Sequence, residues 1–261
     1  MSKVAVVTGA ACGFGFEFSK ILAGDSYDLI MIDIDSRKLD NAKDYILDNY
    51  KVDVLAEVAD LSRPETVHEL YDKIAIREPS ILINNAGIGL VGLFCETDWD
   101  TEMAMINLHI VTVTALTKLF IRDMIKRGEG RIMNVASLAA IIPGPLMSVY
   151  YGTKAYLLSF SAAIANELKG TGVTVTALCP GTTRTGFQEA TAMYSGCKEN
   201  DSSLFTASIN KVVNCGYRAM LKGRVRCIPG IRNKILYGLC CIVPYNQAVT
   251  IMRKIQESIR K

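Results

Sequence analysis

The chain has 261 residues, of which 50% are hydrophobic and 21% are charged, so it can bury a large core. This composition excludes disordered, collagen-like and low-complexity architectures. The net charge of +3, from 29 basic and 26 acidic residues, is too small and too mixed to indicate nucleic-acid binding. The eight cysteines lack the paired spacing of a zinc site and predict reduced thiols in a cytoplasmic protein.

The ends of the chain give no targeting signal. Residues 1–3 lead directly into an apolar segment without the cleavage pattern of a signal peptide, so we expect no leader. No apolar run reaches the roughly 18 residues of a membrane-spanning helix. The nearest candidate, residues 235–243, ends at Pro244. We therefore predict no transmembrane segment.

The predicted elements alternate between strand and helix along the chain. Short β-branched or apolar runs predict strands, and apolar residues at helical spacing predict the helices between them. Strands are expected at residues 3–8, 28–34, 52–58, 80–84, 131–137, 173–178 and 224–228. Helices are expected at 14–23, 36–50, after a capping box at 62–65, and at 98–127 and 149–170. This alternation implies βαβ crossovers and a mostly parallel sheet in one α/β domain covering residues 1–261.

Three glycines lie between the first strand and the first helix, at Gly9, Gly13 and Gly15. Glycine allows the backbone to turn tightly and to approach a ligand closely. The N-terminus of the following helix offers free N–H groups and a partial positive charge to a phosphate. With Cys12 and Phe14 between the glycines, this turn predicts a site for the phosphates of a dinucleotide.

Asp33 stands 18 residues after Gly15, at the end of the second predicted strand. A carboxylate there accepts hydrogen bonds from the ribose hydroxyls of adenosine and repels a 2′-phosphate. The neighbouring Cys12 is uncharged, and no basic residue follows Asp33 directly. We therefore predict NAD rather than NADP, although Arg37 and Lys38 lie near enough to keep NADP open.

Further motifs follow the glycine turn in a fixed order. They are Asp60-Leu61, Asn84-Asn85-Ala86-Gly87, the single residues Asn107 and Ser137, Tyr150-x-x-x-Lys154, and Pro180-Gly181-Thr182-Thr183-Arg184-Thr185. Together with Thr8-Gly9-x-x-x-Gly13-x-Gly15, the set resembles the short-chain dehydrogenase/reductase family in its single-domain branch. The resemblance covers residues 3 to about 185, and residues 186–261 match nothing diagnostic.

The resemblance implies a Rossmann-type doubly wound sheet of about seven parallel strands, with the cofactor across their carboxyl ends. It also implies which residues contact the cofactor: Gly9, Cys12, Gly13, Phe14, Gly15, Asp33, Asp60, Leu61, Asn85, Ala86, Gly87, Tyr150, Lys154, Pro180, Gly181, Thr183 and Thr185. The implied catalytic residues are Asn107, Ser137, Tyr150 and Lys154. We expect no metal.

Tyr150 and Lys154 are four residues apart on a predicted helix and so share one face. A nearby ammonium favours the phenolate, so Tyr150 is expected to exchange a proton with the substrate oxygen. Lys154 is expected to hold the nicotinamide ribose, Ser137 to bind the substrate oxygen, and Asn107 to hold a water linked to Lys154. Tyr151, three residues from Lys154, is interpreted as a packing residue.

Two histidines, His68 and His109, lie in predicted helices without a third ligand, and we interpret both as structural or exposed. Ser137 lacks the sequence of a nucleophile elbow and has no evident histidine base. The sequence therefore favours neither a metal site nor a hydrolase.

The substrate pocket is expected between residues 88–94, 138–149 and 181–205. The first two segments are apolar and contain neither Lys nor Arg, which favours a neutral, mainly apolar substrate over an anionic one. A hydroxysteroid or bile acid is the first candidate, and a medium- or long-chain ketone the second. Residues 186–200 form either a lid or an ordinary surface connection.

The C-terminal segment, including residues 235–243 and the tail to Lys261, is apolar with basic residues nearby. It fits a subunit contact, a pocket wall or a weak membrane-surface contact, and the first two are favoured because the apolar run is short. The resemblance implies a homodimer or homotetramer.

We predict an NAD-dependent oxidoreductase that interconverts a secondary alcohol and a ketone. Alternatives are an NADP-dependent carbonyl reductase and a non-catalytic dinucleotide-sensing module. An epimerase or dehydratase is less favoured, because such relatives usually carry a larger C-terminal domain.

Overall fold

The protein, described by a computed structural model over residues 3–183 and 208–260, contains a seven-stranded parallel sheet. The strands are β1 Lys3–Thr8, β2 Tyr27–Asp33, β3 Val54–Val58, β4 Ile81–Asn84, β5 Gly130–Val135, β6 Val173–Leu178 and β7 Arg226–Cys227. Their order is β3-β2-β1-β4-β5-β6-β7. The chain reverses direction across the sheet between β1 and β4, where open α/β sheets bind their ligands. The predicted doubly wound fold is confirmed.

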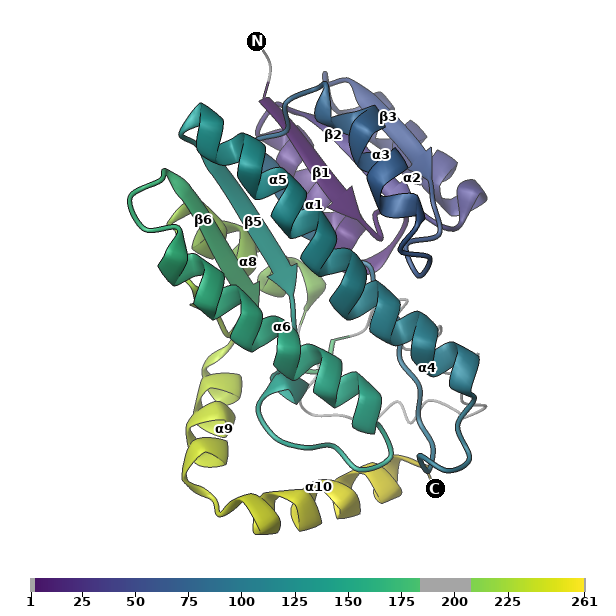
Figure 1. Ribbon diagram of the computed structural model, residues 1–261, viewed down its shortest axis with the longest axis vertical. Coiled ribbons are helices and arrows are strands. Elements are labelled where there is room, and N and C mark those ends of the chain that lie inside the picture. The colour runs from purple at the N-terminus through teal and green to yellow at the C-terminus, as the bar shows by residue number, and fades with distance from the viewer. Residues whose placement is uncertain (1–2, 184–207, 261) are drawn as a thin grey trace.

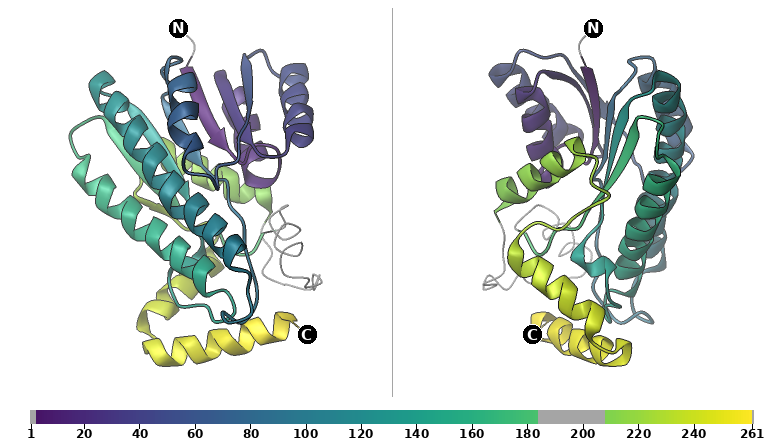
Figure 2. Two further views of the ribbon diagram at one scale, coloured as in Figure 1. Left: turned by 45° about the vertical axis from the view of Figure 1, so that its right-hand side comes forward. Right: turned by 90° about the vertical axis from the view of Figure 1, so that its left-hand side faces the viewer.

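Helices cover both faces of the sheet (Figures 1 and 2). One face carries α1 Gly13–Gly24, α2 Ser36–Asn49 and α8 Ile209–Leu221, and the other carries α3 Thr66–Ala75, α5 Val113–Arg127 and α6 Ser148–Glu167. β-branched and other apolar residues fill both sides of the central strands, so Val6, Val7, Ile30 and Met31 are fully buried. Burial on both sides explains why these strands read as continuous apolar runs.

The long predicted helix at residues 98–127 is divided into three parts. They are α4 Trp99–Ile106, a π-helical segment η1 Asn107–Thr112, and α5. Asp98 caps the N-terminus by accepting a hydrogen bond from the Thr101 N–H, and Gly128 ends the helix with a φ of 74°. Asn107 begins the π-helical segment, and such segments are frequent at functional sites.

The run from Trp99 to Arg127 is also long and apolar enough to cross a membrane by length and composition. Asn107, His109 and Lys118 interrupt the run, so the sequence did not indicate it as a continuous apolar segment. Its apolar side chains are accounted for by packing, because Leu116, Phe120 and Met124 are buried against the sheet. It is therefore a core helix of this domain.

The predicted capping box at residues 62–65 is wrong. The Ser62 hydroxyl and N–H both donate to the carboxylate of Asp60, at 2.6 and 3.0 Å, so Ser62 closes a turn instead of capping a helix. Helix α3 begins later, at Thr66. The remaining strand and helix boundaries differ from the predicted ones by at most three residues.

The C-terminal part contains β7 and two further helices, α9 Ile231–Ile242 and α10 Tyr245–Arg260, with the bend between them at Pro244. Figures 1 and 2 show both helices beyond the carboxyl ends of the strands, with α10 crossing below the start of α6. A short 3-10 helix, η2 Leu138–Ala140, follows β5. The predicted lid at residues 186–200 and Thr185 lie outside the described residues.

Candidate active site

The glycine turn after β1 forms a close-fitting cradle. Gly9 and Gly13 have φ values of 64° and 55°, which side chains disfavour. A Cβ on Gly15 would lie 2.0 Å from the carbonyl oxygen of Gly9. All three glycines are therefore required by the backbone. Cys12 is the exposed N-cap residue of α1, its side chain does not cap the helix, and Phe14 is half-buried. The first N–H groups of α1 thus suit a phosphate.

The residues after β4 hold this turn in place. The Thr8 hydroxyl accepts hydrogen bonds from the N–H groups of Asn85 and Ala86, at 3.0 and 3.1 Å. The Asn85 side-chain amide donates to the carbonyls of Thr8 and Gly9, at 2.9 and 3.0 Å. The ends of β1 and β4 are therefore locked together by four hydrogen bonds. Sequence analysis placed Asn85 and Ala86 at the cofactor but missed the clamping role of Thr8.

Asp33 is half-buried at the end of β2, and its carboxylate faces the turn. One oxygen accepts the Ala11 N–H at 3.0 Å, and the other accepts the Asp35 N–H at 3.1 Å. Each carboxylate oxygen has a second lone pair, so Asp33 retains capacity for ribose hydroxyls. The Lys38 ammonium pairs with the Asp35 carboxylate at 3.3 Å. The pKa of Asp35 is lowered, mainly by the hydrogen bond that it accepts from the backbone N–H of Lys38.

The other predicted cofactor contacts follow neighbouring strands. Asp60 is held by Ser62, and the adjacent Leu61 is buried. After β6, the Pro180 carbonyl accepts the Leu138 N–H at 2.9 Å, and the Thr183 hydroxyl donates to the Gly181 carbonyl at 3.0 Å. These segments all leave the carboxyl edge of the sheet, so the described candidates gather at one edge. The residues fit an extended dinucleotide.

At the start of α6, Lys154 is buried and Tyr150 is half-buried, with Ser137 beside Tyr150. The Lys154 Nζ donates to the Val135 carbonyl at 2.9 Å and lies 5.7 Å from the centre of the Tyr150 ring. Burial raises the pKa of Tyr150 to about 12, and a hydrogen bond with Ser137 acts in the opposite direction. Burial likewise lowers the pKa of Lys154 to about 8.

The Lys154 ammonium was expected to favour the Tyr150 phenolate, and desolvation was not part of that expectation. Desolvation is the largest cause acting on the pKa of each group, and it moves both toward their neutral forms. A phenol of this pKa donates a proton readily only to a strongly polarised oxygen. It can act as a base only as the phenolate, which forms only when a further positive charge is brought close.

Asn107, the first residue of η1, is half-buried on the helix that faces α6. Two residues later, His109 is completely buried. Its Nε2 accepts the Ile88 N–H at 3.2 Å, which leaves the proton on Nδ1. That Nδ1–H donates to the Thr153 hydroxyl at 2.9 Å, and Thr153 donates to the Tyr150 carbonyl at 2.8 Å. His109 therefore links the segment after β4 to the turn of α6 that carries Tyr150.

His109 and Thr153 are positioning residues that sequence analysis did not identify, although it did expect His109 to be structural. The other histidine, His68, is exposed on α3. Tyr151 is a packing residue, as expected: its ring lies against Gly144, and its hydroxyl accepts a 2.9 Å hydrogen bond from Gln256 of α10. Gln256 is 105 residues away from Tyr151 in the sequence, so no local sequence pattern could indicate this contact.

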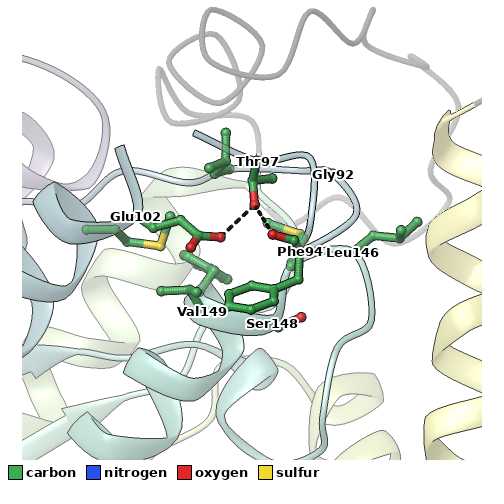
Figure 3. Close-up of a pocket in the computed structure, with 11 residues that line it drawn as sticks. Gly92, Phe94, Thr97, Glu102, Leu146, Ser148 and Val149 are labelled. Atoms are coloured by element: carbon green, nitrogen blue, oxygen red, sulfur yellow. Dashed lines mark hydrogen bonds between the residues drawn. The ribbon is translucent and has the colours of Figure 1, made fainter. Parts of the chain in front are cut away.

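A small pocket opens beside Tyr150 (Figure 3). Both predicted apolar segments contribute to its lining, which includes Leu90, Phe94, Leu146 and Val149. One polar group was not foreseen: the buried carboxylate of Glu102 accepts a 2.7 Å hydrogen bond from the Thr97 hydroxyl. Within the described residues, no cluster of His, Cys, Asp or Glu is suited to a metal.

Comparison with known proteins gives consistent matches. A sequence model described as short chain dehydrogenase matches residues 3–194. Very-long-chain 3-oxoacyl-CoA reductase-B of Danio rerio is 32% identical over 184 residues, which are 69% of this chain and 59% of the relative. Inactive hydroxysteroid dehydrogenase-like protein 1 of Mus musculus is 30% identical over 179 residues, 67% of this chain and 54% of the relative. The chain thus spans less than two thirds of the length of these relatives.

Among solved structures, the short-chain dehydrogenase from Sphingobium yanoikuyae in complex with NADPH has a TM-score of 0.81 and 26% sequence identity. The likeness covers 91% of this chain and 93% of that one. It therefore includes the C-terminal region, which the sequence matches leave out.

The buried His109 makes stability depend on pH. Burial lowers the pKa of His109 well below its usual value, with the charge of Lys154 acting in the same direction. His109 stays neutral in the folded protein, whereas in the unfolded chain it takes up a proton below about pH 6.5. The free energy of unfolding therefore falls as the pH falls below that value, by up to about 1.4 kcal/mol per pH unit from this group.

His109→Gln should remove this component from denaturant unfolding curves measured between about pH 7.5 and about pH 5. Because the chain has only two histidines, His68→Gln is the matched control and should keep the pH dependence of the wild type. Parallel pH profiles for His109→Gln and the wild type would contradict the prediction.

Proposed function

The chain belongs to the short-chain dehydrogenase family, and we propose that it is an NAD-dependent oxidoreductase that interconverts a secondary alcohol and a ketone. The observation that carries the proposal is the group of buried Lys154 and half-buried Ser137 and Tyr150 at the carboxyl edge of the sheet that also carries the glycine cradle. Such a group combines an acid, a hydrogen-bond donor and a cation within one water-poor site. When bound, the nicotinamide cofactor supplies the hydride acceptor or donor.

In the proposed mechanism, Tyr150 moves the proton at the substrate oxygen. In the direction of reduction, its neutral phenol donates to that oxygen while the Ser137 hydroxyl shares the developing charge. In the direction of oxidation, Tyr150 must first lose its proton, which burial opposes. Lys154, which donates to the Val135 carbonyl, would hold the nicotinamide ribose. Asn107 is proposed to hold the water that connects Lys154 to solvent.

For the cofactor, we propose NAD because Asp33 faces the place of the adenosine ribose. A 2′-phosphate there would meet a carboxylate at short range, which is unfavourable. Lys38 is engaged by Asp35, which weakens the case for a basic clamp, whereas Arg37 is exposed on the first turn of α2. The structure of the Sphingobium yanoikuyae relative contains NADPH, so a preference for NADP is the rival proposal.

For the substrate, we propose a neutral, mainly apolar ketone or alcohol. Most residues that line the pocket beside Tyr150 are apolar, and its polar members, Thr97, Glu102, Ser148 and Tyr150, include neither Lys nor Arg. Hydroxysteroids, including bile acids, fit this chemistry, and so do long-chain 3-oxoacyl compounds of the kind named for the Danio rerio relative. We further propose a cytoplasmic homodimer or homotetramer.

A non-catalytic dinucleotide-binding module is the second candidate. It is favoured by the Mus musculus relative, whose name describes it as inactive. Against it stand the four complete positions Asn107, Ser137, Tyr150 and Lys154. The two candidates differ in whether cofactor binding is followed by turnover.

Tyr150→Phe should lower kcat by about 10²–10⁴-fold, because it removes the acid–base group and little volume. Cofactor binding, measured by fluorescence of the reduced nicotinamide, should change little. Tyr151→Phe is the matched control, since it loses only the hydrogen bond from Gln256. Normal turnover by Tyr150→Phe would refute the mechanism.

Asp33→Asn should weaken binding of NADH by roughly 10–100-fold, the usual effect of losing a hydrogen bond to a charged group. Binding of NADPH should weaken less or improve, because the repulsion is removed. Asp44→Asn makes the same charge change at an exposed position of α2 and should leave both affinities unchanged. An unaltered ratio of the two affinities in Asp33→Asn would contradict the NAD assignment.

The substrate class is tested by following reduced-cofactor absorbance with hydroxysteroids, medium-chain ketones, 3-oxoacyl thioesters and small anionic 2-oxo acids. We expect kcat/KM to rise with apolar size and the anionic acids to be the poorest substrates. Preference for small anionic acids would refute the apolar assignment. Tight NADH binding without turnover of any compound would favour the non-catalytic module.

A further inference from the structure

Helix α9 exposes a nearly continuous apolar face. The exposed fractions are 70% for Ile231, 58% for Ile235, 55% for Leu239 and 80% for Ile242. These positions recur at helical spacing and so lie on one side of the helix, where Leu236, 51% exposed, widens the face. Other exposed apolar residues of the chain, such as Ile76, are single surface positions of the ordinary kind.

The opposite side of α9 is fixed to the domain. The Asn233 side chain donates to the Pro229 carbonyl at 2.7 Å, and it closely approaches Gly181. Tyr237 packs against the cluster around Leu157 and Ile228, and its hydroxyl accepts a hydrogen bond from Arg226. These contacts set the rotation of α9. The apolar face therefore points outward from the folded domain.

The charge of α9 and of the sequence on either side of it is one-sided. Residues 202–256 contain nine Lys or Arg residues and no Asp or Glu, so the rest of the chain is acidic in balance. Arg232 and Lys234 on α9 and Lys254 on α10 are exposed. The first following acid, Glu257, is paired with Arg253. The overall net charge of +3 conceals this separation.

We propose that α9 binds the surface of an anionic lipid bilayer, lying flat with its isoleucine and leucine side chains among the acyl chains. A membrane surface matches both features of the helix, because it offers apolar chains beneath negatively charged head groups. A second copy of the chain fits less well, because a two-fold contact through this face would place Arg232 and Lys234 at the interface while α9 offers no acidic residue to pair with them. The proposal is independent of the proposed catalytic function.

The attachment of α10 shows which end of the protein would face the bilayer. Gln256 of α10 donates to the hydroxyl of Tyr151, next to Tyr150, and Leu146 of the pocket lies toward α10 in Figure 3. The α9 and α10 end is therefore the pocket end of the molecule, whereas the cradle of β1 and α1 lies farther inside (Figure 1). An apolar compound leaving the bilayer would meet the pocket first.

The test is flotation of the full-length protein with vesicles of phosphatidylcholine alone or of phosphatidylcholine with phosphatidylglycerol. We expect binding to the mixed vesicles that weakens with salt, and little binding to the neutral ones. Replacing Arg232 and Lys234 by Gln should lower the partition coefficient by about tenfold or more. Salt-insensitive or equal binding to both vesicles would overturn the role of charge.

The apolar face is tested with the double variant Ile235→Ser and Leu239→Ser, which should lose most vesicle binding. Ile76→Ser with Leu47→Ser is the matched control, since it removes an exposed isoleucine and leucine elsewhere. Thermal unfolding and NADH binding should agree among all variants, which separates this test from catalysis. Equal vesicle binding by the two double variants would overturn the proposal.

Light scattering after size exclusion tests the second copy as the alternative occupant. The Ile235→Ser and Leu239→Ser variant should keep the oligomeric state of the wild type. A smaller assembly in this variant, together with no vesicle binding by the wild type, would show that the face is a subunit contact.

Discussion

The backbone at Gly9 passes so close to Ala86 that no side chain fits between them: a Cβ on Gly9 would lie 2.8 Å from the Ala86 Cα. This approach is possible because the side chains of Thr8 and Asn85 form hydrogen bonds with each other's backbone groups, which would otherwise need water. The same segment continues to Gly87, where a Cβ would lie 2.8 Å from Nε2 of His109. From His109, hydrogen bonds lead through Thr153 to the carbonyl of Tyr150. The cofactor cradle and the catalytic turn are thus parts of one hydrogen-bonded unit.

This unit explains why polar groups are tolerated at the centre of the domain. Each donor of His109 and Thr153 has one acceptor, so burial costs little and fixes a single arrangement. Tyr150 and Lys154 are different, since burial moves their pKa values toward the neutral forms. In such low-dielectric surroundings, a positive charge placed beside the phenol alters its pKa more than the same charge in water. The pKa of Tyr150 is therefore sensitive to any charge that binds next to it.

The sequence predicted the strands, their alternation with helices and the described site residues at one sheet edge, because these depend on local periodicity and on motifs with fixed spacing. It did not predict the π-helical segment at Asn107, the role of Ser62 in a turn, or the buried pairing of Thr97 with Glu102. These depend on tertiary neighbours. The desolvation that raises the pKa of Tyr150 was not predicted either, since spacing gives proximity but says nothing of burial.

The C-terminal part limits what family membership can tell about this protein. The curated relatives match over about 180 residues, and the family match ends at residue 194, before α8, α9 and α10. Yet Gln256 of α10 supports Tyr151, and Asn233 of α9 lies against Gly181, so both helices touch segments that surround the site. The part of the chain that the sequence matches cover carries the proposed catalytic residues. The helices beyond it, where basic charge and exposed apolar surface are concentrated, lie against that part, so we propose that they influence which compounds reach the site.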